Sequence, residues 1–171
     1  MKETERSFEA ISDEDLTKLA AIAAEDRAAF YCRNPRYKDA EVLCVALCQG
    51  SALHYVNGDN GIKDFDIWTF YEGAQGIPDF PPRRLAQYDF GESRFGKHPD
   101  DTHCLGRRVD VIGRSIYVRA GGPPEMLQEY FFKGGTKSAR FLAEKAVVLL
   151  EPADLRGVIV WPLEQADKRK S

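Results

Sequence analysis

The sequence predicts an α/β fold in which a central mixed β-sheet is flanked by α-helices. Three observations indicate this class: apolar residues at helical spacing over residues 12–31, an almost wholly apolar run over 42–48, and apolar residues that alternate with acids around 64–71 and 109–118. With 171 residues and 43% hydrophobic content, the chain is long enough for a sizeable core. We therefore expect a single domain over residues 1–171.

The first helix is predicted over about residues 12–31. Ser12 is a favourable N-cap, and three acidic residues follow it in the first turn, where they complement the helix dipole. Asn34-Pro35 should end the helix, because the residue before a proline avoids helical backbone angles. The polar, acidic residues 1–11 predict a loose arm.

A strand, a tight turn and a helix start are predicted in succession from residue 42. The run Val42 to Cys48 is apolar on both faces, as in a central strand, and it is followed by Gln49-Gly50-Ser51. A glycine at this turn lets a phosphate approach the backbone, and the helix N-terminus supplies amide donors. The glycine-rich residues 57–61 should end this helix early.

Three carboxylates are the main candidate site residues. Asp64 and Asp66 are two residues apart, so on a strand they project from one face while Phe65 and Ile67 enter the core. Asp110 stands alone between two valines, and all three acids converge if its strand pairs beside the first. Such a cluster implies a neutralising cation, and oxygen-only ligands suit magnesium or manganese. A plainer interpretation is a turn glycine followed by solvated acids on ordinary strands.

Residues 72–102 interrupt the periodicity with glycines and prolines, which indicates an insertion between the acid-bearing strands. Aromatic residues alternate there with arginines and lysines, a pattern that would allow contact with a base, phosphate or RNA. We favour the other interpretation, in which the aromatic rings fix a long loop to the surface. His98, His103 and Cys104 match no common zinc module, so we expect a polar loop.

The C-terminal part, about residues 123–162, predicts helices and one short strand. A helix is expected at 125–132, a second helix from Thr136 or Ser138 to about residue 150, and a strand at 157–161. The last residues, 167–171, form a charged tail. Residues 133–140 lack the spacing of a phosphate-binding P-loop.

Composition excludes several classes of protein. A net charge of -3 argues against a general nucleic-acid coat protein. No apolar run is long enough to cross a membrane, and the N-terminus is too polar for a secretory signal, so we expect a cytoplasmic protein that does not bind membranes. The four cysteines form no C-x-x-C pair and are expected to be free thiols.

The order of these pieces resembles the DNA polymerase beta type nucleotidyltransferase superfamily, and the small stand-alone members most. The matched core runs from about residue 40 to about residue 120: a Gly-Ser turn after a strand, a D-x-D strand, and a lone acid on a later strand. The resemblance implies a nucleotidyltransferase-like fold and transfer of a nucleoside monophosphate from a triphosphate, such as ATP, to an acceptor hydroxyl, with release of pyrophosphate. It further implies two Mg²⁺ or Mn²⁺ ions held by Asp64, Asp66 and Asp110, with Gly50 and Ser51 on the outer phosphates.

One position departs from the family pattern. Small members commonly carry an arginine on the helix after the Gly-Ser turn, where this chain has His54, which removes a permanent charge. His54 either contacts phosphate or covers the helix. By resemblance, basic residues beyond the third acid reach the triphosphate, so Lys133, Lys137 and Arg140 are candidates.

The acceptor stays open among a small molecule, an RNA end and a protein side chain. A homodimer or a partner protein would complete the cleft if this chain alone does not. The alternative function is that of a non-catalytic member of the same fold that binds a nucleotide or a partner, for example in a toxin-antitoxin pair.

Overall fold

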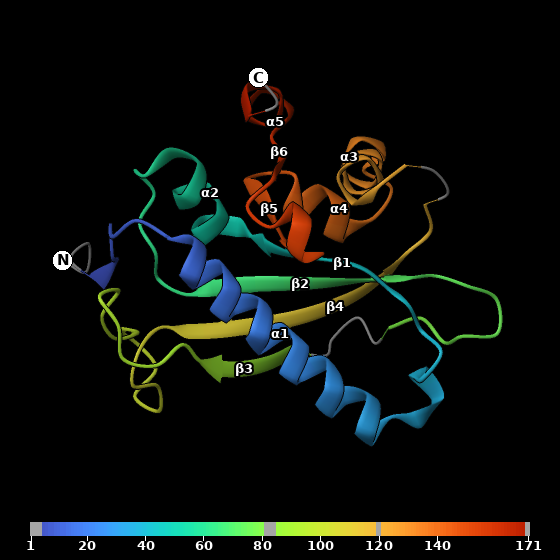
Figure 1. Cartoon of the computed structure of the whole chain (residues 1–171), viewed down its shortest axis with the longest axis horizontal. Helices are drawn as coiled ribbons and strands as arrows, with labels where there is room; N and C mark the ends of the chain where they lie inside the picture. Colours follow the sequence, from blue (N-terminus) through green and yellow to red (C-terminus); the bar gives the residue numbers. More distant parts are fainter. Residues whose placement is uncertain (1–4, 81–84, 119–120, 170–171) are drawn as a thin grey trace.

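A computed structural model describes residues 5–80, 85–118 and 121–169. Within these ranges, the strands form one six-stranded sheet in the order β3-β4-β2-β1-β5-β6 (Figure 1). The strands are β1 (Val42–Cys48), β2 (Phe65–Glu72), β3 (Leu85–Asp89), β4 (Arg108–Ile116), β5 (Ala146–Glu151) and β6 (Ile159–Trp161). The helices are α1 (Asp13–Arg33), α2 (Gln49–Asn57), α3 (Pro123–Lys133), α4 (Lys137–Leu142) and α5 (Leu163–Arg169), with 3-10 turns η2 (Pro35–Tyr37) and η3 (Ala153–Leu155).

The sheet is mixed, which confirms the predicted α/β class. Strands β2 and β4 are parallel, whereas the other neighbouring pairs are antiparallel. No helix in the described ranges is long and apolar enough to cross a membrane.

Helix α1 forms where the sequence predicts it. The Ser12 hydroxyl accepts the Asp15 amide N–H, and the Asp15 carboxylate accepts the Ser12 amide N–H at 2.7 Å, so both partners of a capping box are present. Its buried side chains, among them Leu16, Leu19 and Ala23, recur at helical spacing and face the sheet. The apolar stripe therefore fixes which side of α1 packs on the sheet.

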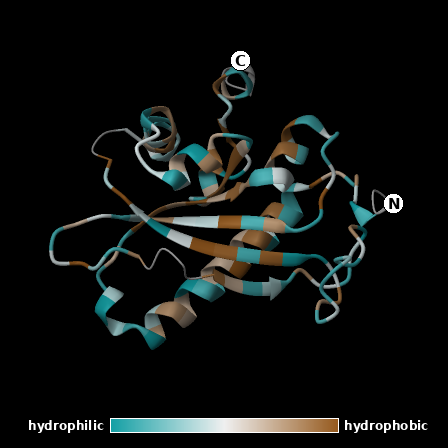
Figure 2. Cartoon of the chain, turned by 180° about the vertical axis from the view of Figure 1, so that it is seen from behind, coloured by the Kyte–Doolittle hydropathy of each residue, from teal (hydrophilic) through white to brown (hydrophobic). Residues whose placement is uncertain are grey.

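The two faces of the sheet are covered by different helices. Helices α1 and α2 pack with Val45, Leu47, Phe65, Ile67 and their neighbours on one face. Helices α3 and α4 pack with the alternate residues of the same strands, such as Ala46, Trp68 and Phe70, on the other. From behind, β2 and β4 run across the view with α1 beyond them, while α3 and α4 lie toward β1, β5 and β6 (Figure 2). Asp66 is two residues before Trp68 on β2, and Asp110 is two residues before Ile112 on β4. Both acids therefore lie on this second face.

Two elements correct the sequence prediction. The helix expected from Thr136 or Ser138 to about residue 150 is wrong: α4 ends at Leu142, and residues 146–151 form β5, which pairs with β1. The run Ala146-Val-Val-Leu-Leu is apolar on both faces and rich in β-branched residues, so pairing inside the sheet outweighs the helical pattern. Part of the expected charged tail, through Arg169, belongs to α5.

The 72–102 insertion contributes strand β3, which pairs with β4 and which the sequence did not predict. Its aromatic rings are mostly buried. Phe80 stacks on Tyr71 with ring centres 4.6 Å apart, and Phe90 and Phe95 pack around Phe65. These rings attach the insertion to the core, as the favoured interpretation expected, and are not exposed for stacking on a ligand. Arg83 and Arg84 lie outside the described residues.

Gly113 tests the packing of the insertion on β4. A Cβ added there would overlap the Phe80 ring, which is held between Tyr71 and Phe30. We expect Gly113→Ala to destabilise the protein by about 1–3 kcal/mol, because the ring has no free space to enter. Urea unfolding would measure the change.

Gly135→Ala is the matched control, since nothing lies within 4 Å of a Cβ added there. Its effect on the free energy of unfolding should stay within about 0.5 kcal/mol. Equal effects of the two substitutions would contradict the packing of Phe80 on Gly113.

Candidate functional site

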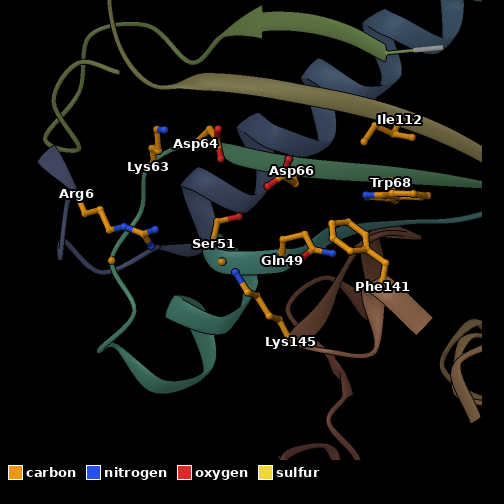
Figure 3. Close-up of a pocket in the computed structure, with 12 residues that line it drawn as sticks. Arg6, Gln49, Ser51, Lys63, Asp64, Asp66, Trp68, Ile112, Phe141 and Lys145 are labelled. Atoms are coloured by element: carbon orange, nitrogen blue, oxygen red, sulfur yellow. The ribbon is translucent and has the colours of Figure 1, made fainter. Parts of the chain in front are cut away.

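A pocket of about 330 Å³ opens where β1 turns into α2. Gly50, Ser51, Asp64 and Asp66 line it together, so four of the predicted site residues meet there (Figure 3). The Ser51 hydroxyl donates to the Cys48 carbonyl at 3.3 Å, which closes the first turn of α2. Helix α2 thus presents its N-terminus to the pocket, and it ends, as predicted, in the glycine-rich turn at Gly58.

Asp110 lies beside Asp66 rather than in the pocket lining. The parallel register of β2 and β4 pairs Asp66 with Asp110, on strands about 4.8 Å apart. Burial, and then the negative charges of Asp64 and Asp110, raise the pKa of Asp66 to about 7. Burial also raises the pKa of Asp110, although nearby Arg108 opposes the shift. The structure therefore brings the three predicted acids to one corner of the sheet.

Arg108 provides positive charge within this corner. Its Nη2 donates to Oδ2 of Asp64 and to Oδ2 of Asp110, both at 3.3 Å. Its Nε forms an ion pair with Asp110 Oδ1 at 3.1 Å. Arg108 thus bridges two of the three acids. Its positive charge offsets part of the negative charge of these carboxylates.

His98 approaches the same acids from the insertion. Its Nδ1 accepts the amide N–H groups of Asp100 and Asp101, at 3.1 and 3.0 Å, so the proton of the neutral ring is on Nε2. Nε2 lies 3.7 Å from Asp64 Oδ2. The loop is polar, as predicted, and its histidine faces the acid corner.

The donor set fits a divalent cation in its chemistry. Asp64, Asp66 and Asp110 offer only carboxylate oxygens, the ligands that Mg²⁺ and Mn²⁺ prefer. The raised pKa of Asp66 indicates negative charge that Arg108 does not fully compensate. With Arg108 between Asp64 and Asp110, however, no group of three His, Cys, Asp or Glu side chains in the described ranges is arranged to hold a metal ion.

Three cationic side chains line the pocket: Arg6, Lys63 and Lys145. Arg6 comes from the N-terminal arm, which the sequence predicted to be loose. Ser7 instead pairs with Ile62 through two backbone hydrogen bonds of 2.9 and 2.7 Å. Arg107 donates to the Glu5 carbonyl at 2.8 Å, and Arg94 to the Ala10 carbonyl at 2.6 Å.

His54 is buried and lies outside this pocket. Its Nδ1 accepts the Gly61 amide N–H at 2.9 Å, so Nε2 is the donor to the Glu9 carbonyl at 3.1 Å. The ring therefore joins α2 to the arm that carries Arg6. The predicted direct contact of His54 with phosphate finds no support in this geometry.

Lys137 and Arg140 are not brought to the pocket either. Both are exposed at the start of α4, and Arg140 donates to the Gly134 carbonyl at 2.7 Å. Lys133 pairs with Glu129 within α3. Among the basic residues that follow Asp110 in the chain, Lys145, after α4, is the one that lines the pocket.

Sequence reasoning missed Gln49, Trp68, Ile112 and Phe141, which also line the pocket. A signal existed for Trp68, since it is two residues beyond Asp66 and so on the same face of β2. The same spacing relates Ile112 to Asp110. No comparable local pattern pointed to Arg6 or Phe141.

Searches of protein-family models, of curated proteins and of solved structures found no match to this chain.

Because of Asp66, the free energy of unfolding should fall as the pH rises. The pKa of Asp66 is about 7 in the folded protein against 3.8 for an unperturbed aspartate, so between these values the folded state holds more protons than the unfolded state. Asp64, Asp110, Arg108 and Lys145 are the charged groups that act on it. With a chelator present to remove metal ions, Asp66→Asn should therefore raise the free energy of unfolding by about 1–3 kcal/mol at pH 8, and by much less at pH 5.

Urea unfolding at the two pH values measures this effect. Asp59→Asn, at an exposed residue after α2, should change stability little at either pH. A gain for Asp66→Asn that is the same at pH 5 and pH 8 would show that its cause is not the charge.

Proposed function

We propose that this chain is a metal-dependent nucleotidyltransferase with a nucleotidyltransferase-like fold. The observation that carries the proposal is the junction of three elements at one corner of the sheet. The Gly50-Ser51 turn and the pair Asp64 and Asp66 line one pocket, and the lone acid Asp110 stands in register beside Asp66. This combination, rather than any single motif, favours phosphoryl chemistry over ordinary surface acids.

The cationic end of the pocket suits the triphosphate. Arg6 and Lys63 lie near Ser51 and Asp64 (Figure 3). The Lys145 Nζ lies near Gly50. A Cβ at Gly50 would lie 4.0 Å from the Lys145 Nζ and 3.0 Å from Nδ2 of Asn60. The glycine therefore leaves open the space in the pocket beside these two groups. The α2 amides and these side chains would together offset the phosphate charges.

The reaction would be an in-line displacement at the α-phosphorus. An acceptor oxygen forms a bond to this phosphorus, the bond to the oxygen that bridges the α- and β-phosphates breaks, and pyrophosphate leaves. The carboxylate of Asp110, whose pKa is raised by burial, takes the acceptor's proton. Arg6 and Lys63 hold the leaving pyrophosphate.

Asp64, Asp66 and Asp110 would hold the divalent cations. These ions would supply positive charge that stabilises the transferring phosphoryl group. Arg108 would have to share its two carboxylates with them. The acceptor remains one of three classes: a small-molecule hydroxyl, an RNA end or a protein side chain.

The second candidate is a non-catalytic protein that binds nucleotides, and Arg108 is the observation that favours it. A guanidinium that already bridges Asp64 and Asp110 offers a structural reason for these acids without a metal. Such a protein would bind nucleotide through its cationic end whether or not a divalent ion is present.

Thermal stabilisation by each of the four nucleoside triphosphates, with and without Mg²⁺, separates the two candidates. A ligand at a hundred times its dissociation constant should add about 2.7 kcal/mol to the free energy of unfolding. We expect stabilisation that depends on Mg²⁺ in the wild type and is lost in Asp66→Asn, with each shift measured from that protein's own ligand-free melting temperature.

Equal stabilisation with and without Mg²⁺ would favour the non-catalytic binder. No shift with any nucleotide would overturn both candidates.

Arg6→Ala tests the cationic end directly. Arg6 is exposed, so the substitution should leave unfolding nearly unchanged while it weakens nucleoside triphosphate binding about 5- to 20-fold, the loss of one charge-assisted contact. Isothermal titration with Mg²⁺ and a non-hydrolysable nucleotide analogue measures the affinity.

Arg140→Ala is the matched control, an exposed arginine outside the pocket. Its affinity should stay within about twofold of the wild type. If Arg140→Ala weakens binding and Arg6→Ala does not, the result would favour the assignment of Arg140 to nucleotide binding that was made from the sequence.

A further inference from the structure

The pocket has a second end that is mainly apolar. Figure 3 shows Trp68, Ile112 and Phe141 on the side of Asp66 away from Arg6 and Lys63, with Gln49 below Asp66 in this view. Trp68 is two residues beyond Asp66 along β2, a distance of about 7 Å on the same face. The triphosphate interactions proposed above use none of these side chains.

Two hydrogen-bond donors in this end lack partners. Gln49 is 8% exposed and Trp68 is 5% exposed. Gln49 Nε2 and Trp68 Nε1 are nevertheless buried without a hydrogen-bond partner among the described residues. An unsatisfied buried donor costs about 1–3 kcal/mol, so two of them in one pocket indicate a ligand that brings acceptors.

The backbone of Gln49 is an independent observation. Its φ of 61° lies in the left-handed region, and in the described ranges it is the only residue other than glycine with a positive φ. An isolated bridge to Ala146 of β5 holds it in place. Strained residues of this kind concentrate at ligand sites, because the surrounding structure must impose them.

We propose that Gln49, Trp68, Ile112 and Phe141 form a nucleobase subsite. A base would lie against the apolar side chains and accept hydrogen bonds from the Gln49 amide and the Trp68 indole N–H. This proposal rests on the proposed function, since it assigns the nucleoside end of the same nucleotide.

The order of chemistry along the pocket supports this occupant. From one end to the other it offers cations, acids and then an apolar surface with two donors (Figure 3). A nucleoside triphosphate has the matching order of anionic phosphates, reacting α-phosphorus, and a flat base with acceptor atoms. Phe141 is 51% exposed, which leaves its ring accessible for stacking at the mouth.

The test compares binding of ATP and GTP with binding of inorganic tripolyphosphate, each with Mg²⁺, by isothermal titration. The wild type should bind at least one nucleotide about tenfold or more tightly than tripolyphosphate, the contribution expected from one stacked base. Phe141→Ala should remove most of this difference, and Gln49→Met should reduce it about fivefold. Neither substitution should change the affinity for tripolyphosphate by more than about twofold.

Phe132→Ala is the matched control, at a phenylalanine of α3 that is 81% exposed and does not line the pocket. It should bind all three ligands as the wild type does. Gln49→Met keeps the length of the side chain, so its melting temperature checks that the turn still folds.

The possible failures are distinguishable. If tripolyphosphate binds as tightly as both nucleotides, or if Phe141→Ala leaves nucleotide binding unchanged, the base subsite is overturned while the phosphate end stands. If the acceptor molecule, and not the base, occupies this end of the pocket, Phe141→Ala would leave nucleotide binding unchanged. If none of the three ligands binds, the proposed function fails, and the subsite fails with it.

Discussion

The in-register parallel pairing of β2 and β4 is the constraint on which the candidate site depends. It places the carboxylates of Asp66 and Asp110 on the same face of neighbouring strands. Burial raises the pKa of both groups there, and the negative charge of Asp64 adds to each shift. Such an arrangement costs stability, so something must compensate it. Arg108 does so in part, through the carboxylates of Asp64 and Asp110. The polar architecture around this corner follows from that requirement.

The N-terminal arm shows how the same corner gathers charge from distant parts of the chain. Three side chains, those of His54, Arg94 and Arg107, donate to backbone carbonyls of residues 5–10. These bonds fix the arm that brings Arg6 to the pocket. His54 thus supports the arm, and Arg6 of that arm lines the pocket.

Costly features concentrate in and around one pocket. They are the strained backbone of Gln49, the unpartnered donors of Gln49 and Trp68, and the carboxyl of Asp66 with a pKa near 7. Each of them reduces stability when considered alone. Their coincidence is what a preformed ligand site predicts, since a bound ligand would satisfy the donors and neutralise the acids.

The sequence by itself determined the α/β class, helix α1 with its Ser12 cap, the strand that ends at the Gly-Ser turn, and the acids that share a strand face. These features depend on residue spacing and local capping, which are properties of contiguous segments. Only the tertiary structure decided that residues 146–151 pair as β5, that Arg108 bridges two acids, and that Arg6, Lys145 and Phe141 reach the pocket while Lys137 and Arg140 do not. Those outcomes depend on which segments pack together, and the spacing of residues along the chain does not determine which distant segments come into contact.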